Sequence, residues 1–195
     1  MSGKLIVLYG INNLGKTTQA KLLVSRLQAA GYLASYLKYP LYELAPSGFL
    51  LNDYLRAGNP WQLSPREAQI IYALNRFQYQ EELNRQLDAG QWIVAEDYVG
   101  TGLSWGWGAG VDLNFLELIN QGLRQPDLAL WLDGERFTSG IEAHHKHEED
   151  EVLITKVRNC HRELAKRYGW LKFEANQSIE ALNDELWQAV KALSL

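Results

Sequence analysis

Positions 10–17 of the sequence read Gly-Ile-Asn-Asn-Leu-Gly-Lys-Thr and carry the clearest chemistry in the chain. They match the Walker A pattern, in which Gly-Lys-Thr follows a glycine after four variable residues. Glycines let the backbone wrap a polyphosphate with its N–H groups, and a helix that starts directly behind the loop adds partial positive charge. Lys16 would reach the β- and γ-phosphates, and the Thr17 hydroxyl would coordinate Mg²⁺.

A tight strand-to-helix turn with a surface lysine is the alternative interpretation of this loop. The motif lies between an apolar run and a segment with helical character, which is the context that phosphate binding needs. We therefore predict that the loop binds a nucleoside triphosphate through Gly10, Asn12, Asn13, Leu14, Gly15, Lys16, Thr17 and Thr18.

Five short apolar runs predict the strands that position this loop. Helical segments separate them, and strands that are apolar on both faces and alternate with helices are typical of a parallel sheet covered on both sides. The fold class is therefore predicted to be α/β, with a five-stranded parallel sheet flanked by helices. The predicted strands are residues 5–9, 33–39, 92–95, 128–132 and 170–173.

Four helices can be placed from local signals. Residues 16–30 follow the loop, and residues 178–193 form the last helix. Ser64-Pro65-Arg66-Glu67 is a capping box that starts a helix to about residue 88, which ends at Gly90. In residues 151–168, one apolar stripe is predicted to be buried, and it would make Cys160 a core residue rather than a reactive thiol. The stripe is Leu153, Val157, Cys160, Leu164 and Tyr168.

Two segments are predicted to be irregular. Residues 100–110 are rich in glycine, with Trp105 and Trp107 between the glycines, and residues 134–151 are polar. The second segment contains His144, His145 and His147, which could bind zinc, become charged over a phosphate, or simply be solvated.

Composition limits the remaining possibilities. The 195 residues suffice for a single domain over 1–195, with a lid insertion at about 134–151. The formal charge of −4 gives no general basic field for a nucleic acid or a membrane surface. One cysteine excludes an intramolecular disulfide and fits a reducing cytoplasm, and the start of the chain has too few apolar residues for a signal peptide. We expect a cytoplasmic protein.

Several short motifs, in this order and spacing, resemble the thymidylate kinase family of nucleoside monophosphate kinases. They begin with the Walker A loop, which runs into Thr18 and Gln19. The others are Lys38-Tyr39-Pro40, Leu74-Asn75-Arg76, Glu96-Asp97-Tyr98 and Gln125-Pro126-Asp127-Leu128. The resemblance implies a three-layer P-loop NTPase fold with a mobile lid, transfer of the γ-phosphoryl group of MgATP to dTMP, small nucleotides as ligands, and a homodimer.

The resemblance also assigns roles to residues. Tyr72 would stack on thymine, Arg76 would bond a base carbonyl, and Thr101 and Trp105 would close the nucleoside pocket. Core packing is the alternative for Trp105, and a solvated arginine the alternative for Arg76. The remaining acceptor-binding positions would be Lys38, Tyr39 and Asp97. Glu96 would take part in catalysis and in water-mediated binding of Mg²⁺ beside Thr17, and Lys146 would be the catalytic cation of the lid.

Three residues depart from the family pattern. Asn12 replaces the family's loop aspartate, while Tyr42 and Asp97 replace two arginines that bind the acceptor phosphate. Lys38 and Arg56 are the nearest basic residues in the sequence that could replace them. Two alternatives therefore stay open: a deoxynucleoside kinase in which Glu96 accepts a hydroxyl proton, and a nucleotide-binding protein with weak or no catalysis.

Overall fold

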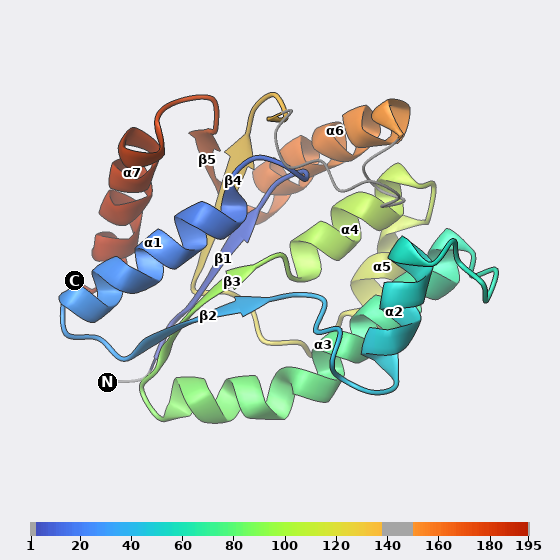
Figure 1. Ribbon diagram of the computed structural model, residues 1–195, viewed down its shortest axis with the longest axis horizontal. Coiled ribbons are helices and arrows are strands. Elements are labelled where there is room, and N and C mark those ends of the chain that lie inside the picture. The colour runs from blue at the N-terminus through green and yellow to red at the C-terminus, as the bar shows by residue number, and fades with distance from the viewer. Residues whose placement is uncertain (1–2, 138–149, 195) are drawn as a thin grey trace.

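The computed structural model describes residues 3–137 and 150–194, and the statements that follow concern these residues. Its centre is a five-stranded parallel sheet with the order β2-β3-β1-β4-β5 (Figure 1). The strands are β1 (Leu5–Tyr9), β2 (Ala34–Lys38), β3 (Trp92–Glu96), β4 (Leu128–Asp133) and β5 (Leu171–Glu174). All residues of β1 and β3 are buried, as expected for central strands covered on both faces. The predicted sheet is confirmed.

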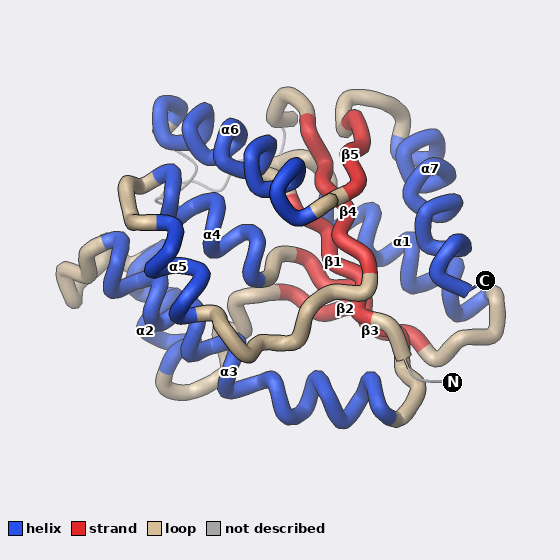
Figure 2. Tube along the Cα trace, turned by 180° about the vertical axis from the view of Figure 1, so that it is seen from behind, coloured by secondary structure: helices blue, strands red, loops and turns tan. Residues whose placement is uncertain are grey.

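Helices cover both faces of this sheet. α1 (Lys16–Ala29) and α7 (Ile179–Lys191) pack together on one face, and a short 3-10 turn (Ala192–Ser194) follows α7. The other face carries α3 (Pro65–Asp88), α4 (Val99–Gly108), α5 (Leu113–Ile119) and α6 (Glu151–Tyr168). α2 (Ser47–Arg56) packs on α3. Figure 2 shows the three layers from behind, with the strands between the two groups of helices.

The capping signals of α3 act as predicted. The Ser64 hydroxyl accepts a hydrogen bond from the Glu67 N–H, and the Glu67 carboxylate accepts one from the Ser64 N–H at 2.8 Å. Gly90 has a φ of +87°, the left-handed conformation that favours glycine.

The prediction of an irregular segment over residues 100–110 is wrong, because most of it forms α4. Local propensity is overridden by packing, since these glycines allow close approach of other elements. A side chain at Gly102 would meet the Arg76 guanidinium, and one at Gly108 would meet Val157 on α6. α4 can therefore pack closer to α3 and α6 than a helix with larger residues at these two positions.

The buried stripe of α6 is rotated by about one residue from the prediction. His161 is fully buried, whereas Cys160 is half-buried and Tyr168 is exposed. Burial lowers the pKa of His161 to about 3, so this imidazole is neutral at physiological pH. Burial also raises the pKa of the Cys160 thiol, which makes the thiolate rarer and agrees with an unreactive cysteine.

No helix in the described parts of the chain has the length and apolar character needed to cross a membrane. The single-domain organisation stays a prediction. Most of the expected lid, including Lys146, His144, His145 and His147, lies outside the described residues.

Candidate active site

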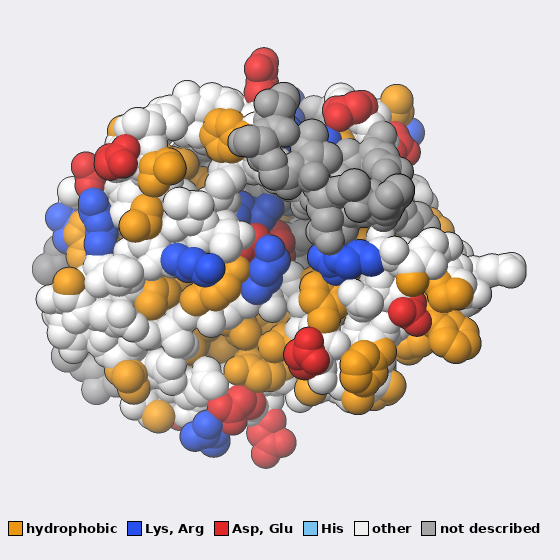
Figure 3. All heavy atoms as spheres, viewed as in Figure 1, with side chains coloured by type: hydrophobic (Ala, Val, Ile, Leu, Met, Phe, Trp, Pro, Cys, Tyr) orange, Lys and Arg blue, Asp and Glu red, His pale blue; other side chains and the backbone are white. Residues whose placement is uncertain are grey.

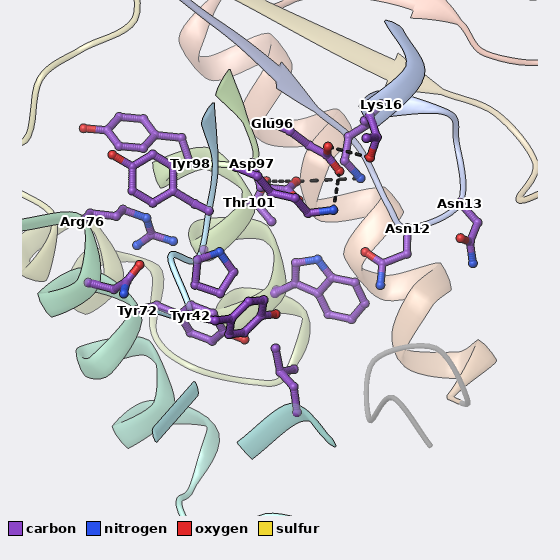
Figure 4. A pocket seen from close by; sticks show the side chains of 18 of the residues that line it. Asn12, Asn13, Lys16, Tyr42, Tyr72, Arg76, Glu96, Asp97, Tyr98 and Thr101 are labelled. Atoms are coloured by element: carbon purple, nitrogen blue, oxygen red, sulfur yellow. Dashed lines mark hydrogen bonds and ion pairs between the residues drawn. The ribbon is translucent and has the colours of Figure 1, made fainter. Parts of the chain in front are cut away.

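A cavity of about 430 Å³ opens at the carboxyl ends of β1, β2 and β3. This edge of a parallel sheet is where ligands bind in α/β proteins. The loop after β1 forms one end of the cavity, while α2, α3 and α4 supply the other end (Figure 4). In the space-filling view, Lys and Arg side chains surround a hollow that also contains acidic side chains (Figure 3).

The loop at the nucleotide end has the backbone that a Walker A motif requires. Gly10 has a φ of +144°, and a Cβ there would lie 2.7 Å from the Leu132 carbonyl oxygen. Gly15 has a φ of +77° and immediately precedes α1, whose first N–H groups have no partner within the helix and can bind an anion. The Lys16 ammonium donates to the carbonyl oxygens of Gly10 at 3.0 Å and Ile11 at 2.8 Å, which holds it inside the loop.

Most of the residues predicted to bind ATP line this end of the cavity. They are Asn12, Asn13, Gly15, Lys16, Thr17 and Thr18. Gly10 and Leu14 are absent from the lining formed by the described residues, and the Leu14 side chain is buried in the core. These two positions would serve through the backbone alone.

Glu96 lies at the centre of a polar cluster on neighbouring strands. Its Oε2 accepts hydrogen bonds from the Thr17 hydroxyl at 2.7 Å and the Tyr36 hydroxyl at 2.5 Å, and its Oε1 lies 3.0 Å from Lys38 Nζ. Burial alone would raise the pKa of Glu96, but Lys16, Lys38 and these hydroxyls outweigh it and lower the pKa. An ionised carboxylate beside a hydroxyl is an oxygen donor set of the kind that Mg²⁺ prefers.

Tyr36 was missed by the sequence interpretation. The signal was available, because Tyr36 and Lys38 are two residues apart on β2 and therefore lie on the same face of the strand. Both reach Glu96, which lies opposite Lys38 at the end of β3.

Asp97 follows Glu96 and faces Lys16. Its Oδ1 lies 3.7 Å from Lys16 Nζ and accepts a hydrogen bond from the Thr101 hydroxyl at 2.9 Å (Figure 4). Asp97 has a φ of +59°, a conformation that aspartate and asparagine tolerate better than most residues. Burial raises its pKa, Lys16 opposes this, and the charge of Glu96 adds to the increase.

The acceptor end of the cavity contains Tyr72 and Arg76 on α3. Residues four apart share one face of a helix, and Figure 4 shows both side chains at the end away from Asn12 and Asn13. Arg76 is 3% exposed, so the alternative of a solvated arginine is wrong. Its Nη1 donates to Asn120 Oδ1 at 2.9 Å.

The other residues predicted to bind the acceptor also line the cavity: Lys38, Tyr39, Asp97, Thr101 and Trp105. Trp105 is 5% exposed and also contributes to the hydrophobic core, so the two interpretations of this residue are compatible.

Several buried polar atoms around Arg76 have no hydrogen-bond partner among the described residues. They are the hydroxyls of Tyr39 and Tyr98, Arg76 Nε and Gln69 Oε1, and all four residues line the cavity. Leaving such groups unpaired costs about 1–3 kcal/mol each. The concentration of these atoms at one end of the cavity therefore indicates a polar ligand there.

Asn75 explains why an amide precedes Arg76 in the sequence motif. It accepts a hydrogen bond from the Leu41 N–H at 2.8 Å and donates to the Leu41 carbonyl at 2.9 Å and to Ser47 Oγ at 2.8 Å. α3 therefore holds the segment after β2 in place, and this segment carries Tyr39 and Tyr42 to the cavity.

These features define the class of protein first: a P-loop nucleotide-binding α/β protein with a second, aromatic-lined subsite at the end of the same cavity. Comparison with known proteins then gives the family. The thymidylate kinase family model matches residues 8–186, and the chain belongs to this family.

Individual relatives agree along nearly the full length. The thymidylate kinase of Synechococcus sp. is 30% identical over 207 residues, which cover 98% of this chain and 97% of that protein. The human thymidylate kinase is 28% identical over 94% of this chain and 88% of its own length. The structure of the Candida albicans thymidylate kinase has a TM-score of 0.87 at 22% identity, covering 99% of this chain and 93% of that chain, and confirms the P-loop NTPase fold.

Proposed function

We propose that this protein transfers the γ-phosphoryl group of MgATP to dTMP and yields dTDP. The observation that carries the proposal is the presence of both subsites in one cavity, with Lys16 at the phosphate end and Tyr72 and Arg76 at the other. Family membership supports the same reaction.

The loop residues would position the donor. Backbone N–H groups of residues 12–18 would bind the phosphates at the N-terminus of α1. The Lys16 ammonium would exchange its carbonyl partners for phosphate oxygens and follow the charge into the transition state.

Thr17 and Glu96 would hold Mg²⁺, since their oxygens face each other at 2.7 Å. When bound, Mg²⁺ neutralises charge on the β- and γ-phosphates. The lowered pKa of Glu96 keeps its carboxylate ionised for this role at neutral pH. The expected lid cation, Lys146, stays a prediction.

At the acceptor end, Tyr72 would stack on the base and Arg76 would donate to a base carbonyl. Thr101 and Trp105 would close the pocket, a role supported by their position on α4 and in the lining of the same cavity. Binding both substrates in one cavity brings the reacting groups together, and the protein has little covalent chemistry to perform.

The test is a panel of dTMP, dUMP, dCMP, dGMP and thymidine with MgATP, followed by release of ADP. Turnover of dTMP above all the others is expected. Faster turnover of dGMP or dCMP would contradict the thymine assignment.

A nucleoside hydroxyl is the second candidate acceptor. The observation that favours it is Asp97, a carboxylate where the family has a phosphate-binding arginine. The Asp97 carboxylate repels a phosphate dianion but not an uncharged hydroxyl, whose proton Glu96 would accept. Faster turnover of thymidine than of dTMP in the same panel would decide for this activity.

We also propose a homodimer that forms through α2 and α3. Ile70, Leu74 and Phe77 recur along one face of α3 and are 46%, 42% and 40% exposed, and Phe49 on α2 is 57% exposed. Apolar side chains gathered in this way commonly mark an interface. Sedimentation of the wild type and of Leu74→Glu tests this proposal, with a dimer expected for the first and a monomer for the second. A cytoplasmic location stays a prediction.

A further inference from the structure

Binding of a phosphate dianion at the acceptor side of the cavity requires a surplus of positive charge. A phosphomonoester carries close to two negative charges at neutral pH. The two lysines that reach this region are already opposed by carboxylates, since Lys38 Nζ lies 3.0 Å from Glu96 and Lys16 Nζ lies 3.7 Å from Asp97. A dianion would therefore meet about as much negative as positive charge from these four side chains.

Arg56 is a further cation at the same cavity. It lies in the last turn of α2, and its side chain lines the cavity together with Lys38 and Tyr42. The helix C-terminus favours a basic residue at this place. The buried neighbours Tyr54 and Leu55 anchor this end of α2, so the backbone that carries Arg56 is fixed.

The guanidinium of Arg56 lies over an aromatic ring. Its Cζ is 4.6 Å from the centroid of the Tyr42 ring. Tyr42 in turn packs against the cluster that contains Tyr54 and Leu55. A planar cation stacked on an aromatic ring is held in orientation, and its N–H groups lie in the plane of the guanidinium, a geometry that suits a phosphate.

Tyr42 occupies the position where the family pattern has an arginine. At this position the structure has the guanidinium of Arg56, which comes from α2 and stacks on the Tyr42 ring. We propose that Arg56, aligned by Tyr42, binds the phosphate of the acceptor. The inference rests on the proposed function, because it needs a monophosphate acceptor.

The experiment combines turnover with direct binding. KM for dTMP and for ATP, and calorimetric affinities for dTMP and thymidine, are measured for the wild type, Arg56→Ala and Arg56→Lys. A charged hydrogen bond removed at a partly solvated site should cost about tenfold in dTMP affinity. The affinity for thymidine, which has no phosphate, should change less than twofold. The dTMP affinity of Arg56→Lys should lie between those of the wild type and Arg56→Ala, because lysine keeps the charge but not the planar arrangement of donors.

Arg66 offers a matched control. Its guanidinium Cζ lies 3.5 Å from the centroid of Phe115, and Arg66 is exposed and absent from the lining of the cavity. Arg66→Ala removes the same charge and the same kind of stacking, so a general effect of net charge would appear in both variants. The dTMP affinity of Arg66→Ala is expected to equal that of the wild type.

The role of Tyr42 is tested by Tyr42→Phe and Tyr42→Leu. The first keeps the ring and should weaken dTMP binding less than the second. Combined with Arg56→Ala, Tyr42→Leu should add little further loss, because the two residues act together.

The outcomes separate the two proposals. If Arg56→Ala binds dTMP as tightly as the wild type, the role of Arg56 is overturned even when dTMP is the substrate. An equal loss for dTMP and thymidine would also overturn it. If Arg56→Ala loses dTMP affinity selectively but the wild type turns over thymidine faster than dTMP, Arg56 contacts the phosphate of bound dTMP, but dTMP is not the acceptor and the proposed reaction fails.

Discussion

The guanidinium of Arg76 on α3 donates from Nη1 to Asn120 Oδ1 at 2.9 Å, and both side chains are buried. Asn120 is fixed in turn, because its Nδ2 donates to the Leu116 carbonyl of α5 at 2.8 Å. A neutral amide thus orients Arg76 without cancelling its charge. The remaining donors of the guanidinium keep their strength for a ligand.

Arg76→Ala should weaken binding of dTMP far more than binding of ATP. Loss of a buried, charged hydrogen bond costs about 1.5–3 kcal/mol, which corresponds to roughly 10- to 150-fold in affinity. Arg76 and the Walker A loop lie at opposite ends of the cavity, so the donor site should stay intact. Calorimetry with each nucleotide checks this expectation. Equal losses for both nucleotides would indicate misfolding rather than a lost contact.

Asn120→Asp is a sharper test of how Arg76 is held. The carboxylate has almost the same shape, so it should keep the hydrogen bond and form an ion pair with the guanidinium. The ion pair would draw charge and donors away from the base, and KM for dTMP should rise roughly 3- to 10-fold, about 1 kcal/mol. KM for ATP should change little, whereas the melting temperature should fall, because a carboxylate cannot donate the hydrogen bond that Asn120 Nδ2 gives to the Leu116 carbonyl. If Asn120 only supported the fold, the variant would leave KM for dTMP unchanged.

Gly102→Ala should act on the same guanidinium from α4. A Cβ at this position would lie 2.5 Å from Arg76 Nη2, and the flexible end of the arginine would have to move. We expect weaker binding of dTMP with a loss of stability below about 1 kcal/mol.

Gly100→Ala, in the same helix, should lower the stability of the protein rather than the affinity for dTMP. A Cβ there would lie 2.6 Å from the Trp170 ring and 2.8 Å from Tyr9, and these rings pack against each other at 4.3 Å. Overpacking should cost about 1–3 kcal/mol of stability. Melting temperatures together with dTMP affinities separate the two effects. A selective loss of dTMP binding in both variants, or in neither, would contradict the role given to Gly102.

Lys16→Ala should reduce kcat by orders of magnitude and leave the fold intact. The ammonium is the loop side chain expected to follow the charge of the transferred group, while its partners in the structure are two loop carbonyls. Turnover and circular dichroism of the variant are the measurements. Near-normal turnover would mean that the loop binds nucleotide without taking part in catalysis.

The sheet and the nucleotide end of the site could be predicted because their signals are local. An apolar run, a glycine loop and Gly-Lys-Thr follow one another directly, and the structure places Lys16 and Thr17 on the cavity as expected. The capping box of α3 is equally local, since Ser64 and Glu67 are three residues apart.

The helix α4 could not be predicted, because its stability depends on partners far away in the sequence. Gly102 meets Arg76, and Gly108 meets Val157. Within the site, Asn120 was missed for the same reason, since nothing near it indicates that its amide would meet Arg76 on another helix. Arg56 was considered only for its nearness in the sequence, and its stacking on Tyr42 requires the fold.

The last prediction concerns Asp97, whose pKa is raised mainly by burial. An acid with a higher pKa in the folded state binds its proton more tightly there than in the unfolded chain. The folded state is therefore favoured below the unfolded pKa, near 3.9 for aspartate, and this advantage is lost as the pH rises through the folded pKa. At pH 7 the ionised carboxylate lowers the stability of the protein.

Asp97→Asn should remove this cost and keep the local structure. Asparagine tolerates the φ of +59°, and its amide oxygen can still accept the hydrogen bond from Thr101. The melting temperature of the variant should exceed that of the wild type near pH 7, and the difference should shrink as the pH falls toward about 4. KM for dTMP should also decrease, because a charge that repels the phosphate is removed.

Asp88→Asn is the control for this measurement, since it removes one carboxylate at an exposed position at the end of α3. Melting temperatures are recorded for the three proteins between pH 4 and pH 8. A variant that is less stable than the wild type at pH 7 would show that the attraction between Asp97 and Lys16, 3.7 Å apart, outweighs the burial of the carboxylate. The role of Asp97 would then be to position Lys16. In Asp97→Asn, kcat would fall, and KM for dTMP would stay unchanged.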